Sequence, residues 1–122
     1  MNLPSDADEV TDNIYNYGYR TPRFRVSLHL FLQVDDPHGE IANAHCTDMS
    51  EAGLAAEVKI PLEIGAKVTL IFTLPGTSTP MRIVASVVHR QIDRYGFVFA
   101  FSSQSQRDTV HAYLESRYAR MF

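Results

Sequence analysis

The sequence predicts a small all-β domain, a six-stranded antiparallel β-barrel followed by one C-terminal α-helix. Three observations support this prediction. Apolar and polar residues alternate in six short segments, turn residues separate these segments at near-regular intervals, and helical spacing begins only after residue 102. With 122 residues, 45% of them hydrophobic and 20% charged, the chain can bury one core. We therefore expect one barrel with the helix covering an open end.

The first strand has the clearest pattern. Even-numbered residues from Phe24 to Val34 are all apolar, which is typical of a long, half-buried strand. The sequence from Asp35 to Gly39 favours a turn, and a second strand is expected over residues 40–47. Further strands are expected at 54–60, 68–74, 81–92 and 95–101, with the last two joined as a hairpin at Asp93 and Arg94.

The two ends of the chain differ from the strand region. Ser103 and Ser105 offer helix caps, and Val110, Leu114 and Tyr118 recur at helical spacing, so a helix is expected from about 104 to 120. Residues 1–18 hold four acidic residues and no Lys or Arg. We interpret residues 1–18 as a flexible acidic leader and residues 19–122 as the folded domain.

Charge and composition exclude several classes of protein. A net charge of −3 argues against a protein that binds nucleic acid polymers, which would carry a basic excess. The N-terminus lacks the apolar segment of a signal peptide, and no apolar run is long enough to insert into a membrane. The single cysteine, Cys46, excludes an intramolecular disulfide. These features favour a cytoplasmic protein.

Enzyme and metal motifs are weak in this sequence. Ser50 lacks the preceding glycine of a nucleophile elbow, so a hydrolase that uses Ser50 is the weakest alternative. His45 and Cys46 are adjacent on an expected strand and would point to opposite faces. Without a second cysteine, a structural zinc site is not expected. We expect no enzymatic activity, no metal and no cofactor.

Two groups of polar residues indicate a ligand site. Arg20, Arg23 and Arg25 form a cluster in which arginine is the only basic residue type, and the planar guanidinium suits bidentate contacts with phosphates and guanine edges. A segment further along the chain combines a carboxylate, a hydroxyl and a glycine in Asp48–Gly53. A lone arginine cluster is also compatible with an exposed strand rim. Barrel closure would bring the two groups together, which favours a site for a phosphate-bearing small molecule.

The chain resembles a PilZ domain over roughly residues 19 to 118. The resemblance rests on the arginine cluster, the Asp48-x-Ser50-x-x-Gly53 motif, the loop at Gly65 and the strand Tyr95–Phe99 before a terminal helix. It implies a six-stranded antiparallel barrel. In many members it also implies binding of the bacterial second messenger cyclic di-GMP, through Arg-x-x-x-Arg followed by Asp/Asn-x-Ser-x-x-Gly.

The second motif is intact, whereas the first departs from the family pattern. If Arg23 is aligned with the second arginine, Tyr19 stands at the first position, and Arg20 is its neighbour. If Arg25 is aligned there instead, Thr21 stands at the first position. We favour the alignment on Arg23, with Arg20 as a compensating arginine. The resemblance then implies that Arg20 and Arg23 contact phosphates and a guanine edge, with Arg25 beside them. Ser50 would donate to a base or phosphate.

Asp48 and Gly53 complete the site that the resemblance implies. Asp48 would accept from a guanine edge or fix an arginine, and Gly53 would allow a tight turn or close approach of the ligand. Two functions follow as expectations. One is a cyclic di-GMP sensor that signals to a protein effector by a conformational change. The other is a PilZ-like adaptor that binds no nucleotide and acts through protein contacts.

Overall fold

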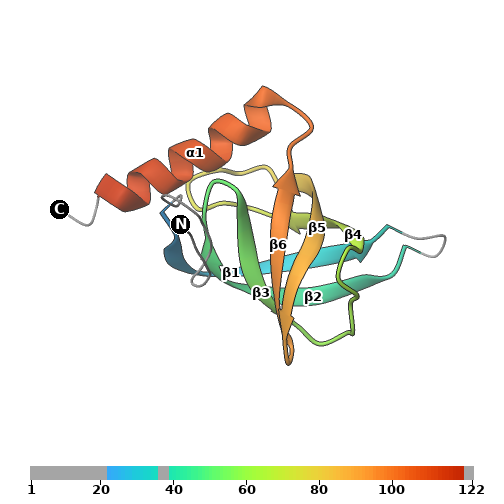
Figure 1. The fold of residues 1–122 in the computed structure, drawn as a ribbon. Helices are drawn as coiled ribbons and strands as arrows, with labels where there is room; N and C mark the ends of the chain where they lie inside the picture. The colour runs from blue at the N-terminus through green and yellow to red at the C-terminus, as the bar shows by residue number, and fades with distance from the viewer. Residues whose placement is uncertain (1–21, 36–38, 120–122) are drawn as a thin grey trace, which may run out of the picture.

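The computed structural model describes residues 22–35 and 39–119. Six strands form a closed barrel in the order β1-β2-β3-β6-β5-β4, and every neighbouring pair is antiparallel (Figure 1). The elements are β1 (Phe24–Val34), β2 (Ile41–Met49), β3 (Gly53–Val58), β4 (Lys67–Phe72), β5 (Met81–Gln91), β6 (Arg94–Ala100) and α1 (Gln104–Ala119). The predicted all-β barrel with a C-terminal helix is confirmed.

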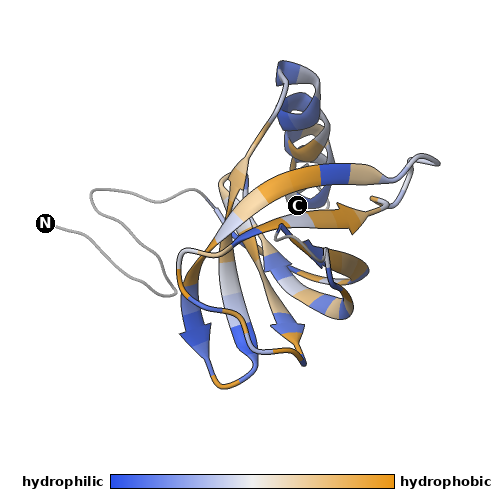
Figure 2. Cartoon of the chain, turned by 90° about the vertical axis from the view of Figure 1, so that its right-hand side faces the viewer, coloured by the Kyte–Doolittle hydropathy of each residue, from blue (hydrophilic) through white to orange (hydrophobic). Residues whose placement is uncertain are grey.

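Alternation along the strands builds the core. Figure 2 shows hydrophobic and hydrophilic bands along the strands, and the hydrophobic side chains that point inward are buried. Strand β1 is long enough to pair with β2 along most of its length and with β4 near its end, which closes the barrel. The core includes Leu30, Leu32, Leu54, Val68, Leu70, Ile83, Val87 and Tyr95.

The hydroxyl group of the buried Tyr95 is satisfied by hydrogen bonds. Tyr95 is almost fully buried, and its hydroxyl accepts a hydrogen bond from the Leu62 amide at 3.0 Å. The same hydroxyl donates to the Ile60 carbonyl at 3.5 Å. Tyr95 on β6 therefore fastens the segment that follows β3 without leaving a buried polar atom unpaired.

Helix α1 lies across the end of the barrel at which β6 ends (Figure 1). Val110 and Leu114 point into the barrel and are only 1% and 2% exposed. The Ser103 hydroxyl accepts a hydrogen bond from the Gln106 amide at 3.2 Å, which caps the first turn as predicted. The expected end of the helix at residue 120 lies outside the described residues.

Several predicted boundaries are wrong by one or two residues, and one of these differences concerns the candidate site. β2 does not end at Thr47; it continues through Asp48 to Met49, and β3 begins at Gly53 rather than Leu54. A bulge between Cys46 and Asp48 restores the pairing, so that Met49 lies opposite Leu54. Asp48 is therefore a strand residue, and the turn itself is residues 50–52.

The hairpin between β5 and β6 turns one residue earlier than predicted. β6 begins at Arg94, so the connection consists of Ile92 and Asp93. Ile92 takes the positive φ of 58° that such a two-residue turn requires. The predicted leader, residues 1–18, and the middle of the 35–39 turn lie outside the described residues. Among the residues that are described, no helix is long and apolar enough to cross a membrane.

Candidate functional site

The bulge in β2 creates the polar end of this strand. Cys46 is buried in the barrel, whereas Thr47 and Asp48 are both partly exposed next to one another. Thr47 is the extra residue, because Cys46 pairs with Ala56 and Asp48 pairs with Ala55. Two consecutive polar side chains thus become available to groups on the outer surface of the barrel.

Burial keeps the thiol of the neighbouring Cys46 uncharged. Desolvation, followed by the negative charge of Asp48, raises the pKa of the Cys46 thiol to about 12. The thiol donates a hydrogen bond to the Asp48 carbonyl at 3.3 Å. Cys46 is therefore an uncharged core residue at neutral pH.

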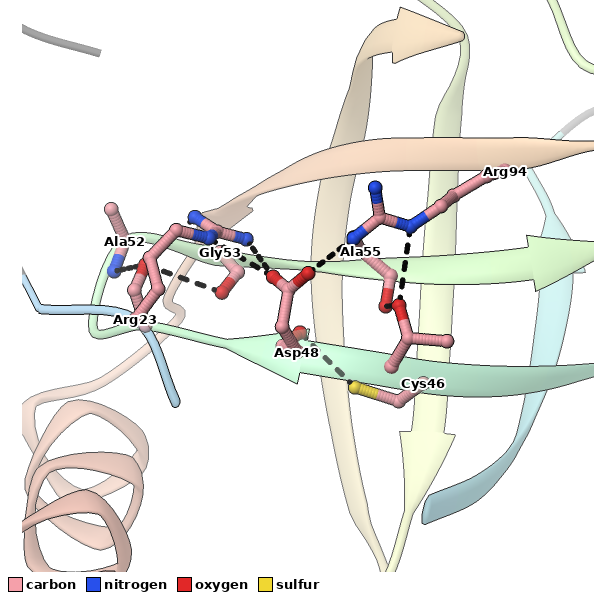
Figure 3. A network of polar contacts seen from close by, with 9 residues as sticks. Arg23, Cys46, Asp48, Ala52, Gly53, Ala55 and Arg94 are labelled. Carbon is pink, nitrogen blue, oxygen red and sulfur yellow. Dashed lines mark hydrogen bonds and ion pairs between the residues drawn. The ribbon is translucent and has the colours of Figure 1, made fainter. Parts of the chain in front are cut away.

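Arg23 joins the two parts of the predicted site. It immediately precedes β1, and its Nε donates to Asp48 Oδ1 at 3.0 Å across 25 residues of sequence. Arg23 Nη2 forms an ion pair with the same oxygen, and Nη1 donates to Ser50 Oγ at 3.3 Å (Figure 3). One guanidinium therefore contacts the carboxylate and the hydroxyl of the Asp48-x-Ser50-x-x-Gly53 motif together.

A second arginine, Arg94 on β6, reaches the same carboxylate from the opposite side (Figure 3). Its Nη2 forms an ion pair with Asp48 Oδ2, and its Nε donates to Thr47 Oγ1 at 3.3 Å. Arg94 was not among the predicted site residues, because its sequence context predicts a turn. The contact depends on the pairing of β2, β3 and β6, and no local pattern indicates it.

Ser50 is buried within the turn that follows β2. It is 1% exposed, and its hydroxyl accepts a hydrogen bond from the Ala52 amide at 3.2 Å and donates to the Gly53 carbonyl at 3.4 Å. The Ser50 amide donates to the same carbonyl at 2.8 Å. This hydroxyl therefore holds the turn and faces Arg23 at the same time.

Gly53 is required by the close packing of two strands. A Cβ atom at this position would overlap the carbonyl oxygen of Phe97 on β6 and lie 3.0 Å from its carbonyl carbon. Gly53 is not among the described glycines with positive φ. The reason predicted for this glycine was a tight turn or an approaching ligand, whereas the structure gives a different reason, which is the approach of β6.

The other predicted arginines are placed differently. Arg25 lies opposite Asp48 in the β1–β2 ladder and is exposed, and its side chain makes no hydrogen bond to another described residue. Its carbonyl accepts a hydrogen bond from Arg117 of α1 at 2.6 Å. Arg20 lies outside the described residues. Of the six predicted site residues, the structure thus brings Arg23, Asp48 and Ser50 into direct contact.

The helix also contacts the motif itself. His111 Nδ1 lies 2.6 Å from Glu51 Oε2, and Glu51 is in the turn between Ser50 and Gly53. The hydrogen bond to Glu51 and the charge of this carboxylate raise the pKa of His111 above its ordinary value of 6.5. Glu115 lies further away, at 3.8 Å from Nε2. α1 therefore contacts both segments of the site. His111 bonds to the turn after β2, and Arg117 bonds to the Arg25 carbonyl near the start of β1.

Two other observations leave the groove beside α1 unsuited to a negatively charged ligand and the described residues without a metal site. A groove between residues 74–77 and α1 is lined by residues that include Asp108, Thr109 and Tyr113, but by no basic side chain and by none of the predicted site residues. Within residues 22–35 and 39–119, no group of three or more His, Cys, Asp and Glu side chains could hold a metal ion. The cluster around Asp48 is therefore the candidate site.

Comparison with known proteins agrees with this fold. The PilZ domain of CeSA from a cellulose-synthesizing bacterium aligns at a TM-score of 0.62 and 18% identity, covering 74% of this chain and 91% of that one. The PilZ domain of YcgR from Escherichia coli with c-di-GMP aligns at a TM-score of 0.59 and 20% identity, covering 84% and 96%. MrkH from K. pneumonia in complex with c-di-GMP aligns at 0.66 and 18% identity, covering 84% of this chain.

The chain spans about half of the MrkH chain, 52% of its length. No curated protein matches the sequence. The family model described as PilZ domain matches residues 19–116, which is most of the sequence. The chain belongs to the PilZ domain family.

Proposed function

We propose that this domain is a non-enzymatic sensor of cyclic di-GMP. The ligand-binding residues in this proposal are Arg20, Arg23, Arg25, Asp48, Ser50 and Gly53. Membership of the PilZ family supports the proposal, as do the solved PilZ structures of YcgR and MrkH that contain c-di-GMP. The second messenger is the ligand of this domain rather than a cofactor.

The observation that carries the proposal is the position of Arg23. Its guanidinium contacts Asp48 and Ser50, which lie 25 and 27 residues further along the chain. These contacts use one N–H group on each of the three nitrogens, so two of the five N–H groups make no hydrogen bond to another described residue. A preformed guanidinium of this kind can bind a phosphate or the O6 and N7 atoms of guanine with little loss of entropy.

The signal would pass from the site to a protein effector by a conformational change. Binding of phosphates by Arg20 and Arg23 draws the segment before β1 onto the barrel. This movement exposes or hides a surface that the effector recognises. No covalent step is involved, and the free energy of the change comes from the difference in ligand affinity between the two conformations.

Calorimetry with purified full-length chain tests the proposal. We expect cyclic di-GMP to bind with a Kd in the micromolar range or below, and Arg23→Ala and Asp48→Ala to abolish the heat signal. Arg82→Ala is the matched control, because Arg82 is exposed on β5 and donates to Gln33 rather than to any site residue. Cyclic di-AMP carries the same phosphates without guanine and should bind much more weakly.

One observation favours a second function. Asp48 and Ser50 already have hydrogen-bond partners within the chain, and Tyr19 stands where the first arginine of the family motif belongs. In a PilZ-like adaptor that binds no nucleotide and acts through protein contacts, we would expect the polar groups of the site to be hydrogen-bonded within the chain in this way. No heat from the wild-type chain at high cyclic di-GMP concentration would refute the sensor and support the adaptor.

A further inference from the structure

Arg94 has hydrogen-bonding capacity that its contacts in the described chain do not use. Its Nε and Nη2 are bonded to Thr47 and Asp48, so three of the five guanidinium N–H groups make no hydrogen bond to another described residue. Figure 3 shows Nη1 pointing away from the network. The side chain is 47% exposed, so these donors are accessible from solvent.

Small residues give the Arg94 side chain a path to Asp48. Asp48 on β2 lies opposite Ala55 on β3, which in turn lies opposite Gly96 on β6. Arg94 starts two residues before Gly96 and crosses β3 to reach the carboxylate (Figure 3). A large side chain at position 55 would obstruct this path. The crossing places the guanidinium on the outer surface of the barrel, beside the carboxylate that Arg23 also holds.

The resulting charge arrangement suits a phosphate. Asp48 accepts from Arg23 through Oδ1 and from Arg94 through Oδ2, so one negative charge lies between two guanidiniums. The cluster of these three residues carries one net positive charge. Because both arginines bond to the same carboxylate, each is held in place before a ligand arrives, and each retains N–H groups that bond to no other described residue.

We infer that Arg94 is a ligand-binding residue that supplies the second guanidinium of the site and binds a phosphate of the ligand. The inference rests on the proposed function. It adds a binding residue from β6 to a motif whose first arginine position is occupied by Tyr19. The site would thus take one guanidinium from the segment before β1 and one from the barrel wall.

A purely structural role for Arg94 predicts different behaviour. If Arg94 only oriented Asp48, its removal would act through the carboxylate, and it would add nothing to the loss caused by Asp48→Asn. If Arg94 contacts a phosphate directly, removing its charge should make the affinity for the ligand less dependent on ionic strength than in the wild type. A direct contact also allows lysine to restore part of the affinity, since lysine keeps the charge but lacks the planar fork.

The experiment is a calorimetric titration of cyclic di-GMP into four full-length proteins: wild type, Arg94→Ala, Arg94→Lys and the control Arg82→Ala. Titrations are run at low and high salt, and circular dichroism confirms that each variant is folded. We expect Arg94→Ala to raise Kd at least tenfold and to weaken its salt dependence. Arg94→Lys should recover part of the loss, and Arg82→Ala should stay within about twofold of wild type.

The outcomes separate this inference from the proposed function. If the wild type binds and Arg94→Ala binds equally well, the inference is wrong and the sensor stands. If Arg94→Ala weakens binding without changing the salt dependence, Arg94 acts only through Asp48, and the phosphate contact is refuted. If the wild type itself does not bind, the proposed function fails and the inference fails with it.

Removing the negative charge of a neighbouring residue gives a second measurement. Glu57 on β3 lies opposite Arg94 in the β3–β6 ladder and is exposed. Its carboxylate opposes the approach of a phosphate to Arg94 by Coulomb repulsion. Glu57→Gln should therefore lower Kd at low salt by about two- to threefold in the wild type. The same substitution should have a smaller effect in the Arg94→Ala background, and an equal effect in both would contradict the phosphate contact.

Discussion

The turn residues of the candidate site and the arginines beside them are held in place by different interactions. Ser50 and Gly53 are buried within the barrel, the first by hydrogen bonds inside its turn and the second by the close approach of β6. Arg23 and Arg94 lie on the surface and are held by one carboxylate, Asp48. The buried pair belongs to the packing of the fold, whereas the arginines belong to its surface chemistry.

This difference explains how the Asp48-x-Ser50-x-x-Gly53 motif can be intact while the arginine motif departs from the family pattern. The turn cannot change without disturbing the β3–β6 contact or leaving the Ala52 amide unpaired. An exposed guanidinium contributes little to folding and can come from another part of the barrel surface. Substitutions in the turn should therefore destabilise the fold, and substitutions of the charged residues should affect ligand binding with little loss of stability.

The largest effect is expected for Gly53→Ala. The added methyl group overlaps the Phe97 carbonyl, so β3 and β6 must separate, and we expect a loss of about 3 kcal/mol in the free energy of unfolding. Urea denaturation measures it. Gly96→Ala is the matched control, because its methyl would lie 3.2 Å from the His89 Cβ and 4.0 Å from the His89 amide nitrogen, without the overlap found at Gly53, and should cost less than about 1 kcal/mol. Equal losses for the two variants would contradict this account.

A smaller loss of stability is expected for Ser50→Ala. The substitution leaves the Ala52 amide without its hydroxyl acceptor in a part-buried turn, which costs about 1–2 kcal/mol. The control is Ser86→Ala on β5, whose hydroxyl makes no hydrogen bond to another described residue, and which should change stability by less than about 0.5 kcal/mol. If Ser50→Ala were as stable as the control, the hydroxyl would not hold the turn.

Asp48→Asn should change the stability least among the motif residues. Its ion pairs with Arg23 and Arg94 are partly exposed, so their removal should cost less than about 1 kcal/mol. Asp93→Asn breaks the exposed pair with Lys59, at 2.9 Å, and provides a comparison with an ion pair outside the site. A loss for Asp48→Asn well above that for Ser50→Ala would show that the arginine network is part of the folding core.

The contact between His111 and Glu51 connects the two regions through α1 and depends on pH. Because the folded pKa of His111 is raised above 6.5, its stabilising contribution is complete below that value. It is lost as the pH rises through the folded pKa. The difference in unfolding free energy between wild type and His111→Gln should therefore shrink from about pH 6 to about pH 9.

Proton NMR titration of the His111 ring measures the same contact directly. Glu51→Gln should lower the pKa of His111 more than Glu115→Gln does, since Glu51 is the principal cause of the shift and Glu115 and Asp108 contribute less. An unchanged pKa in Glu51→Gln would show that the helix is not bonded to the turn in solution.

Much of the fold and half of the site could be predicted from local patterns. The alternation from Phe24 to Val34 defined β1, and the Asp48-x-Ser50-x-x-Gly53 motif located a turn with its carboxylate and hydroxyl. The end of β2 was predicted wrongly because the bulge at Thr47 adds one residue to the strand, and its polar side chains resemble those of a turn. Arg94 was missed because it meets Asp48 across 46 residues.

The sequence by itself determined the all-β class, the number of strands and the family, because side-chain alternation and turn residues act over a few neighbouring positions. The tertiary structure decided which arginines share Asp48 and why residue 53 is a glycine. Both depend on the register of β3 against β6, which brings Gly53 opposite Val98 and Glu57 opposite Arg94. Register arises from closure of the whole barrel, so no short segment of the chain contains it.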